Sequence, residues 1–149
     1  MSRTRDARSA EFAVLLERAG FRRTPQREHV YRVLLSKPDH PTADEVFMRA
    51  RKGMPEISMA TVYNTLDALV QAHLVRVVNH DRGAARYCAN MRPHHHFHCD
   101  VCGAAFDIEE PAATTLPRLD LPPGFQAQRF EVVVRGVCER CGRGRPGGA

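Results

Sequence analysis

The amino-acid sequence predicts an α+β fold in which a winged helix-turn-helix is followed by a small α/β domain. Three observations predict it. Apolar residues recur at helical spacing in four segments of the first half, the hydrophobic period then changes to two on either side of a turn-rich loop, and two Cys-x-x-Cys pairs mark the second half. The chain has 149 residues, enough for one domain or for two small ones that share an interface.

Four helices are expected first, and each has its own start or stop signal. The first ends at Gly20, the second begins at Thr24-Pro25, the third opens with the capping box Thr42-Ala-Asp-Glu45, and Ser58 caps the fourth. The apolar side of the fourth helix is formed by Met59, Val62, Leu66, Leu69 and Val70.

A two-stranded hairpin is expected after the fourth helix. Residues 74–78 and 85–89 have the strand period, and residues 79–83 between them are rich in turn-forming types. Helices followed by such a hairpin describe a winged helix-turn-helix, whose last helix before the wing enters the major groove of DNA. The alternative is a helical domain that never touches nucleic acid, because many winged helices mediate protein contacts instead.

The candidate DNA contacts lie on the fourth helix, before the second helix and on the wing. The side of the fourth helix opposite its apolar stripe presents Ala60, Thr61, Asn64 and Ala68, with Tyr63 and Thr65 at its margins. Asn can bond adenine, and Thr or Tyr can meet thymine methyl groups or phosphates. Candidate phosphate contacts are Arg22, Arg23, Arg27, Arg82 and Arg86. Residues 1–90 hold 15 Lys and Arg against 10 Asp and Glu, and residues 91–149 hold 7 of each, which favours a polyanionic partner for the first half.

Four of the five cysteines predict a zinc site. Cys99 and Cys102 form one Cys-x-x-Cys pair, and Cys138 and Cys141 form another after 35 intervening residues. Two such pairs suit tetrahedral zinc with four thiolate ligands, whereas a thioredoxin-like dithiol would need a βαβ pattern that the sequence lacks. A glycine follows each pair, as tight turns prefer.

The histidines before the first cysteine pair predict a second metal site. In a strand, His94, His96 and His98 share one face, and His95 points to the other face together with Phe97 and Cys99. The alternation therefore separates a histidine site from the zinc site on one strand. The alternative is a run of surface histidines or a metal trap like a purification tag. His98 and the wing-loop His80 are reserve ligand candidates, and each is expected to be exposed to solvent.

The domain organisation follows from these motifs. We expect a winged-helix DNA-binding domain over 1–89, a hinge at 90–93, a metal-binding domain over 94–142 and a disordered tail over 143–149. The elements expected in the second domain are strands at 94–99 and 104–109, a helix at 111–119, a turn at 121–124 and a β-rich segment at 125–137.

Five strings occur in one order along nearly the whole chain. They are Arg22-Arg-Thr-Pro-Gln-Arg27, His40-Pro-Thr-Ala-Asp-Glu-Val46, Ala60-Thr-Val-Tyr-Asn-Thr-Leu66, His94-His-His-Phe-His-Cys-Asp-Val-Cys-Gly103 and Cys138-Glu-Arg-Cys141. In these strings, from about residue 12 to 142, the sequence resembles the ferric uptake regulator (Fur) family. The resemblance implies a homodimeric, metal-dependent transcription factor whose C-terminal α/β domain dimerises.

The resemblance also implies roles for individual residues. The four paired cysteines match the family's structural zinc ligands. His94 and His96 match two ligands of its regulatory site, His40 matches the ligand from the DNA-binding domain, and Asp107 matches a further carboxylate ligand. The regulatory metal would be Fe²⁺, Mn²⁺ or Zn²⁺.

Cys88 departs from the iron- and peroxide-sensing pattern. Those members usually have Asp or Glu there, and zinc-sensing members often have a cysteine ligand nearby. A thiolate favours Zn(II), but Asn64-Thr65, the His-His-His-Phe string and Asp107 are more similar to the peroxide-sensing subgroup. The alternative role for Cys88 is that of a small buried hydrophobic residue.

The resulting hypothesis is a repressor that binds an inverted-repeat operator and senses peroxide or a metal, with a zinc-uptake regulator as the alternative. An enzyme is not expected, because no His-Glu-x-x-His motif occurs and four-thiolate zinc has no open position. A more remote alternative is a zinc-ribbon module that binds RNA or protein. The sequence has neither an apolar run of membrane-spanning length nor an N-terminal secretory signal, so a cytoplasmic protein is expected.

Overall fold

The computed structural model describes residues 3–78, 83–109, 119–127 and 132–143, and the side chains from residue 10 onward. The chain divides into two compact units, residues 1–91 and 92–149. The division falls within the stretch 90–93, and of the expected tail only Arg143 belongs to the described residues. No helix in these ranges is long and apolar enough to cross a membrane.

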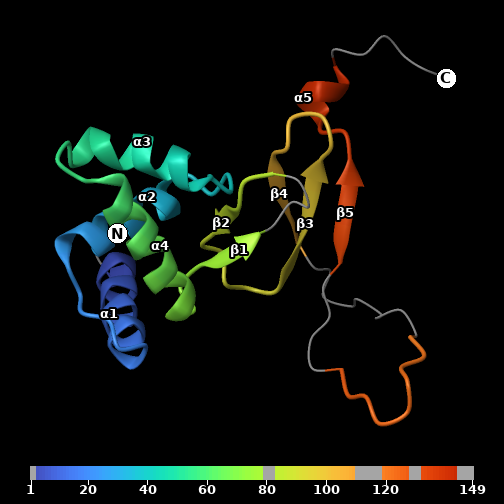
Figure 1. The fold of residues 1–149 in the computed structure, drawn as a ribbon, viewed down its shortest axis with the longest axis horizontal. Coiled ribbons are helices and arrows are strands. Elements are labelled where there is room, and N and C mark those ends of the chain that lie inside the picture. The colour runs from blue at the N-terminus through green and yellow to red at the C-terminus, as the bar shows by residue number, and fades with distance from the viewer. Residues whose placement is uncertain (1–2, 79–82, 110–118, 128–131, 144–149) are drawn as a thin grey trace. The chain divides into compact units, whose positions relative to one another are not determined.

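The N-terminal unit is a winged helix-turn-helix, as the sequence predicts (Figure 1). A hairpin whose two strands have three residues each follows its last helix. The strands are antiparallel, with Val77 opposite Tyr87. The elements are α1 (Arg3–Arg18), α2 (Pro25–Ser36), α3 (Ala43–Gly53), α4 (Met59–Gln71), β1 (Arg76–Val78) and β2 (Arg86–Cys88).

The sequence signals at the helix ends are confirmed. Gly20 ends α1 with a φ of +82°, a conformation that costs glycine little. The Thr24 side chain accepts a hydrogen bond from the Arg27 amide, and the Ser58 side chain accepts one from the Thr61 amide. Both halves of the capping box between Thr42 and Glu45 are present at α3. These local bonds define where each helix begins.

Apolar side chains from all four helices meet in one core. Phe12 stacks on Tyr31 with ring centroids 5.1 Å apart, which joins α1 to α2. The buried residues that form this core are Phe12, Leu16, Val30, Leu34, Ala43, Val46, Ala50, Ile57, Val62, Leu66, Leu69, Ala72, Leu74, Val75 and Tyr87. Because Tyr87 belongs to β2, the core also anchors the hairpin to the helices.

The C-terminal unit is built on a sheet of order β4-β3-β5, with β3 antiparallel to β4 and parallel to β5. Its elements are β3 (His94–Cys99), β4 (Ala105–Glu109), β5 (Val133–Gly136) and α5 (Glu139–Gly142). The turn at 121–124 is confirmed by the bond from the Phe125 amide to the Pro122 carbonyl, 3.1 Å long. Most of the expected helix at 111–119 lies outside the described residues, and the same holds for 128–131 of the β-rich segment.

Candidate metal sites and nucleic-acid interface

The four paired cysteines converge in the C-terminal unit. Cys99 ends β3, Cys102 lies in the turn before β4, and Cys138 and Cys141 lie at the start and within α5. The four sulfur atoms all lie within 4.8 Å of one another, and Cys102 Sγ is 3.8 Å from Cys138 Sγ. Tetrahedral zinc with bonds of about 2.3 Å needs sulfur atoms about 3.8 Å apart. The spacing therefore fits zinc.

Backbone bonds hold this cluster together. The parallel pairing of β3 with β5 places Cys99 opposite Gly136, and the Asp100 amide donates to the Gly136 carbonyl at 2.8 Å. Gly103 has a φ of +69°, as expected of a turn glycine, and its amide donates to the Cys99 carbonyl. The same expectation for Gly142 is wrong, because that residue continues the α5 helix after Cys141 and has no positive φ.

The electrostatics of the cluster call for a cation. Hydrogen bonds from the backbone amides of Cys102 and Cys138 lower the pKa of Cys99 to about 6. A hydrogen bond with Cys138, together with burial, raises the pKa of Cys141. Thiols this close cannot all ionise without a positive charge between them. Zn²⁺ would supply that charge, so the cluster fits the structural zinc that the sequence predicts.

A second cluster lies on the other face of β3. His94 and His96 are buried on one face, and the pairing of β3 with β4 sets Asp107 directly opposite His96. His94 Nε2 lies 2.9 Å from His96 Nε2 and 3.1 Å from Asp107 Oδ1, and His96 Nε2 lies 3.6 Å from the same oxygen. Two imidazole nitrogens and a carboxylate oxygen thus converge on one point.

The tautomer of His94 suits a metal ligand. Its Nδ1 lies 2.7 Å from the Arg92 carbonyl oxygen, which can only accept, so Nδ1 carries the hydrogen. The Nε2 lone pair then faces His96 and Asp107. Metal-bound histidines commonly use their second ring nitrogen in this way. The arrangement fits a divalent cation.

The N-terminal unit has two potential ligand atoms of its own. A ring nitrogen of His40 and the sulfur of Cys88 lie within 4.8 Å of each other, and both residues are buried. His40 comes from the loop before α3, and Cys88 ends β2. Nitrogen and thiolate sulfur are ligands that suit zinc and other soft or borderline metals.

Two histidines outside these clusters were expected to be exposed. His98 is 2% exposed, so that expectation is wrong for it; it lies on the face of β3 that also carries His94 and His96. His80 lies outside the described residues.

The exposed face of α4 is narrower than the sequence predicts. Tyr63 is 46% exposed and Asn64 is exposed, whereas the Thr61 hydroxyl lies 2.8 Å from that of Ser58. Thr65 is 2% exposed, so its expected place at the margin of this face is wrong, and Ala68 is buried as well. Ala60, Tyr63 and Asn64 are the exposed candidates for base contact, and Thr61 is half-buried.

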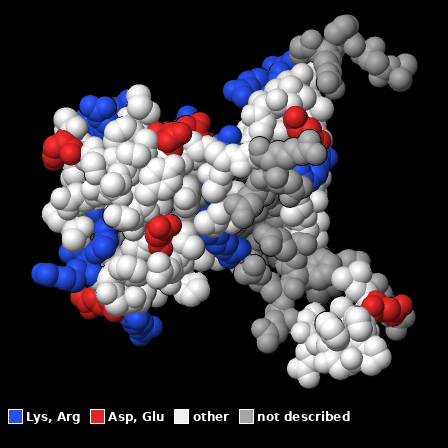
Figure 2. Space-filling view, in the orientation of Figure 1, with Lys and Arg blue, Asp and Glu red and all other residues white. Residues whose placement is uncertain are grey.

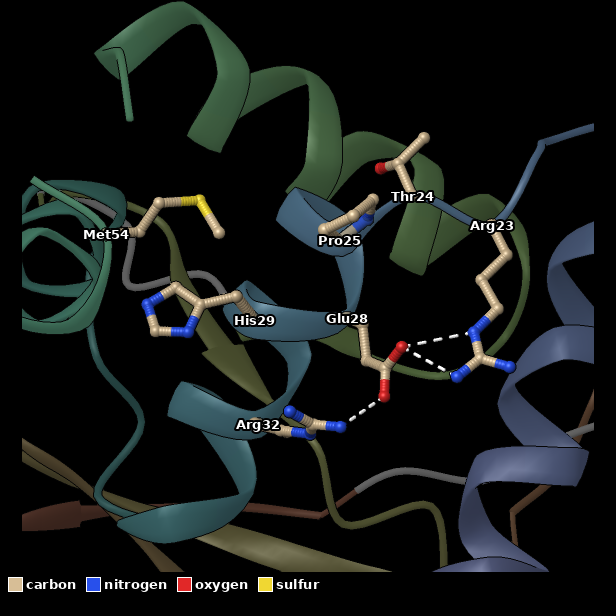
Figure 3. Close-up of a pocket in the computed structure, with 7 residues that line it drawn as sticks. All are labelled: Arg23, Thr24, Pro25, Glu28, His29, Arg32 and Met54. Atoms are coloured by element: carbon tan, nitrogen blue, oxygen red, sulfur yellow. Dashed lines mark hydrogen bonds and ion pairs between the residues drawn. The ribbon is translucent and has the colours of Figure 1, made fainter. Parts of the chain in front are cut away.

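The arginines near α2 contact their own chain. Both guanidinium groups of Arg23 and Arg32 bind the Glu28 carboxylate, with the shorter Arg23 bond at 2.8 Å (Figure 3). Hydrogen bonding from Arg23 is the main reason why the pKa of Glu28 is lowered. These residues line a shallow cavity of about 430 Å³ together with His29. Arg27 donates to the Arg22 carbonyl and covers the Phe21 ring at 5.4 Å.

On the wing, Arg86 differs from the expected phosphate contact. Its guanidinium donates to the His40 carbonyl at 2.9 Å, and its side chain is 18% exposed. It is therefore turned toward the His40 loop, which corrects the expectation, and Arg82 lies outside the described residues. On the face drawn in Figure 2, cationic side chains of the N-terminal unit lie at separate places with acidic ones between them.

Known proteins are similar to this chain in fold and in sequence. The sequence model of the ferric uptake regulator family matches residues 18–135. The peroxide-responsive repressor PerR of Staphylococcus aureus is 33% identical over 127 residues, which are 85% of this chain and 86% of the repressor. The Helicobacter pylori ferric uptake regulator Fur aligns with a TM-score of 0.71 at 18% identity, over 92% of this chain and 93% of that one. The Campylobacter jejuni peroxide stress regulator aligns with a TM-score of 0.61 at 23% identity, over 95% and 100%.

A winged helix joined to a small sheet domain with a cysteine cluster and a histidine–aspartate cluster defines a metal-responsive, DNA-binding transcriptional regulator. Because the family model and the Staphylococcus aureus relative both match most of its length, the chain belongs to the ferric uptake regulator family. Members of this family are regulators rather than enzymes.

Proposed function

We propose that the protein is a homodimeric, metal-dependent repressor whose regulatory ion is bound by ligands from both units. His40 and Cys88 would come from the N-terminal unit, and His94, His96 and Asp107 from the C-terminal unit. One observation supports this above all: each unit, taken by itself, gathers fewer than the four protein ligands of a closed metal site, two in the N-terminal unit and three in the C-terminal unit.

The proposed switch acts through the stretch 90–93 between the two units. Ligands drawn from both units would restrain that hinge when the site is filled. The restrained dimer would present its two α4 helices to successive major grooves about 34 Å apart, over an inverted-repeat operator. Driving the hinge from 1:99 to 99:1 needs about 5.5 kcal/mol of differential metal affinity, which a site with several ligands can supply.

The signal we propose first is peroxide. The relative from Staphylococcus aureus is a peroxide-responsive repressor, and the shared length is large. Iron at the regulatory site would supply the redox chemistry that oxidises His40 or His94. Alternatively, the Cys88 thiolate would attack one oxygen of hydrogen peroxide, breaking the O–O bond to form a sulfenic acid and release hydroxide. Either change removes a ligand and would release the operator.

A second candidate function is zinc sensing, and Cys88 favours it. Replacement of an oxygen ligand by a thiolate shifts a site toward Zn(II). In that case metal depletion, rather than oxidation, would release the operator. Under both functions the protein binds double-stranded DNA in the cytoplasm.

One experiment separates these functions. Operator binding by the zinc-loaded full chain is measured with added Fe²⁺, Mn²⁺ or Zn²⁺, before and after peroxide. Peroxide sensing predicts that binding with Fe²⁺ is lost after peroxide while binding with Mn²⁺ survives. Zinc sensing predicts tight binding with Zn²⁺ that chelation abolishes. Operator affinity that is unchanged by chelation contradicts both.

A further inference from the structure

The loop that carries His40 adopts a conformation that needs external support. His40 has a φ of +54°, in the left-handed region that non-glycine residues seldom adopt. A residue in this conformation is strained and persists where the surrounding structure holds it. The contacts around 37–42 therefore decide where the imidazole lies.

One support comes from α3. Asp39 and Arg49 form a two-pronged ion pair with distances of 2.7 and 2.8 Å, and the Arg49 side chain is only 24% exposed. Paired hydrogen bonds of this kind fix orientation as well as distance. The residue before His40 is thus attached to the helix that follows the loop.

The other support comes from the wing strand β2. The Tyr87 amide donates to the Pro41 carbonyl at 3.0 Å, and Arg86 forms an isolated antiparallel bridge with Thr42. Arg86 Nη1 donates to the His40 carbonyl at 2.9 Å. The backbone of His40 is therefore held by a side chain of the strand that also carries Cys88.

Glu45 keeps the Arg86 side chain in place. Its Oε2 lies 3.5 Å from Arg86 Nη1 and also accepts the Thr42 amide at 2.8 Å as part of the capping box. A carboxylate beside the guanidinium offsets the cost of covering the charge of Arg86, whose side chain is 18% exposed. We name the contacts among Arg86, Glu45 and the His40 carbonyl the wing clasp.

We propose that Arg86 is a positioning residue of the regulatory metal site, and that the wing clasp couples the occupancy of that site to the order of the wing. The inference rests on the proposed function, because it assumes that His40 and Cys88 bind one ion. Arg86 and Cys88 are two residues apart on β2 and share a face. One short strand thus supplies the thiolate and fixes the backbone of its nitrogen partner.

The hairpin itself makes this coupling effective. Within the described residues, β1 and β2 pair through three residues each. A two-stranded hairpin is marginally stable by itself, so this one depends on the packing of Tyr87 in the core and on the bridge between Arg86 and Thr42. An ion held by His40 and Cys88 would reinforce the wing clasp and keep the wing ordered within the DNA-binding unit. Removal of the wing clasp is therefore expected to weaken metal binding. It should also make the order of the wing independent of whether metal is bound.

The test is a cobalt(II) titration of the full chain that already holds one zinc per chain. Cobalt bound by Cys88 gives a thiolate charge-transfer absorption, which reports this site separately from the zinc cluster. Arg86→Met should bind cobalt 10- to 100-fold more weakly, which is the usual range when a residue that orients a metal ligand without touching the metal is removed. Arg86→Lys, which keeps a donor for the carbonyl, should recover part of the loss.

Two further variants guard against a general loss of structure. Arg32→Met removes an arginine–glutamate pair on α2 and should leave the cobalt titration unchanged. Glu45→Gln keeps an acceptor for the Thr42 amide but removes the ion pair with Arg86, and should weaken cobalt binding less than Arg86→Met. Hydrogen exchange at the amides of β1 and β2 should slow on metal binding in the unmodified protein and not in Arg86→Met.

The outcomes separate the inference from the proposed function. Cobalt affinity of Arg86→Met within twofold of the unmodified protein, with the same thiolate absorption, overturns the role of Arg86 alone. If the unmodified protein shows no thiolate absorption from a second ion, the proposed function fails and the inference fails with it.

Discussion

The cysteine cluster and the histidine–cysteine ligands differ in how the fold distributes them. All four cysteines belong to one unit, and the pairing of β3 with β5 brings them together. The residues proposed as regulatory ligands are divided instead, with His40 and Cys88 in one unit and two histidines and Asp107 in the other. A site completed within one unit can support a fold permanently, whereas ligands divided between two units suit a metal that reports a condition.

The largest effect on the fold is expected from substitution of one cysteine of the cluster. Cys138→Ser should lose zinc and unfold the C-terminal unit, because structural zinc contributes roughly 10–16 kcal/mol of apparent binding free energy. Zinc content and circular dichroism measure the result. Cys88→Ser is the matched control and should keep its zinc. A folded, zinc-free Cys138→Ser protein would mean that the cluster is not structural.

The next effect concerns the histidine face of β3. His96→Ala should leave the zinc and the fold in place but reduce metal-dependent operator affinity by at least about 100-fold, since an ion that cannot bind cannot restrain the hinge. His95→Ala, on the other face of the same strand, is the control and should bind DNA normally. Fluorescence anisotropy with a labelled operator provides the measurement. Equal affinities of the two variants would contradict the division into two sites.

A smaller effect is expected from the identity of the ligand at Cys88. Cys88→Asp should lower the ratio of Zn²⁺ to Mn²⁺ affinity by about tenfold or more, because a carboxylate replaces a thiolate. Competition between the two metals, followed by metal analysis of the dialysed protein, gives this ratio. An unchanged ratio would show that the sulfur is not a ligand and is only a buried small side chain.

The smallest effect concerns a contribution to the free energy of unfolding that involves neither metal site. The pKa of Glu28 is lowered, chiefly by the hydrogen bond from Arg23. A lowered pKa stabilises the fold above the unfolded-state value of about 4.3 and loses that contribution as the pH falls through the folded-state value. Glu28→Gln should therefore cost about 1 kcal/mol at pH 7 and progressively less toward acid. Urea unfolding measures it, and a constant difference between the proteins at every pH would contradict this cause.

Local patterns were sufficient to predict most of the fold. Caps at Thr24, Thr42 and Ser58 each involve residues within one turn, so the sequence displays both partners of the bond. Strand alternation likewise placed His94 and His96 on one face before any register was known. The position of Asp107 opposite His96 depends on how two strands align, and only resemblance to a family indicated that residue.

The errors share a physical cause, which is tertiary contact. Thr65 lies three residues after Val62 and four before Leu69, so it faces the core as soon as that core is wider than the apolar stripe. Arg86 resembles a phosphate contact in sequence because its carbonyl partner is 46 residues away. The pair of Asp39 and Arg49 was not anticipated either, since its partners are ten residues apart and follow no helical or strand spacing.

The alternation along β3 constrains how this protein can evolve. His94, His96 and His98 occupy one face, and Cys99 at the end of the same strand has the opposite parity. Deletion of a single residue between His96 and Cys99 would turn the sulfur toward the imidazoles and merge two chemistries that depend on being apart. The length of this segment is therefore as important as its residue types, and loss of one codon here is expected to disrupt both sites at once.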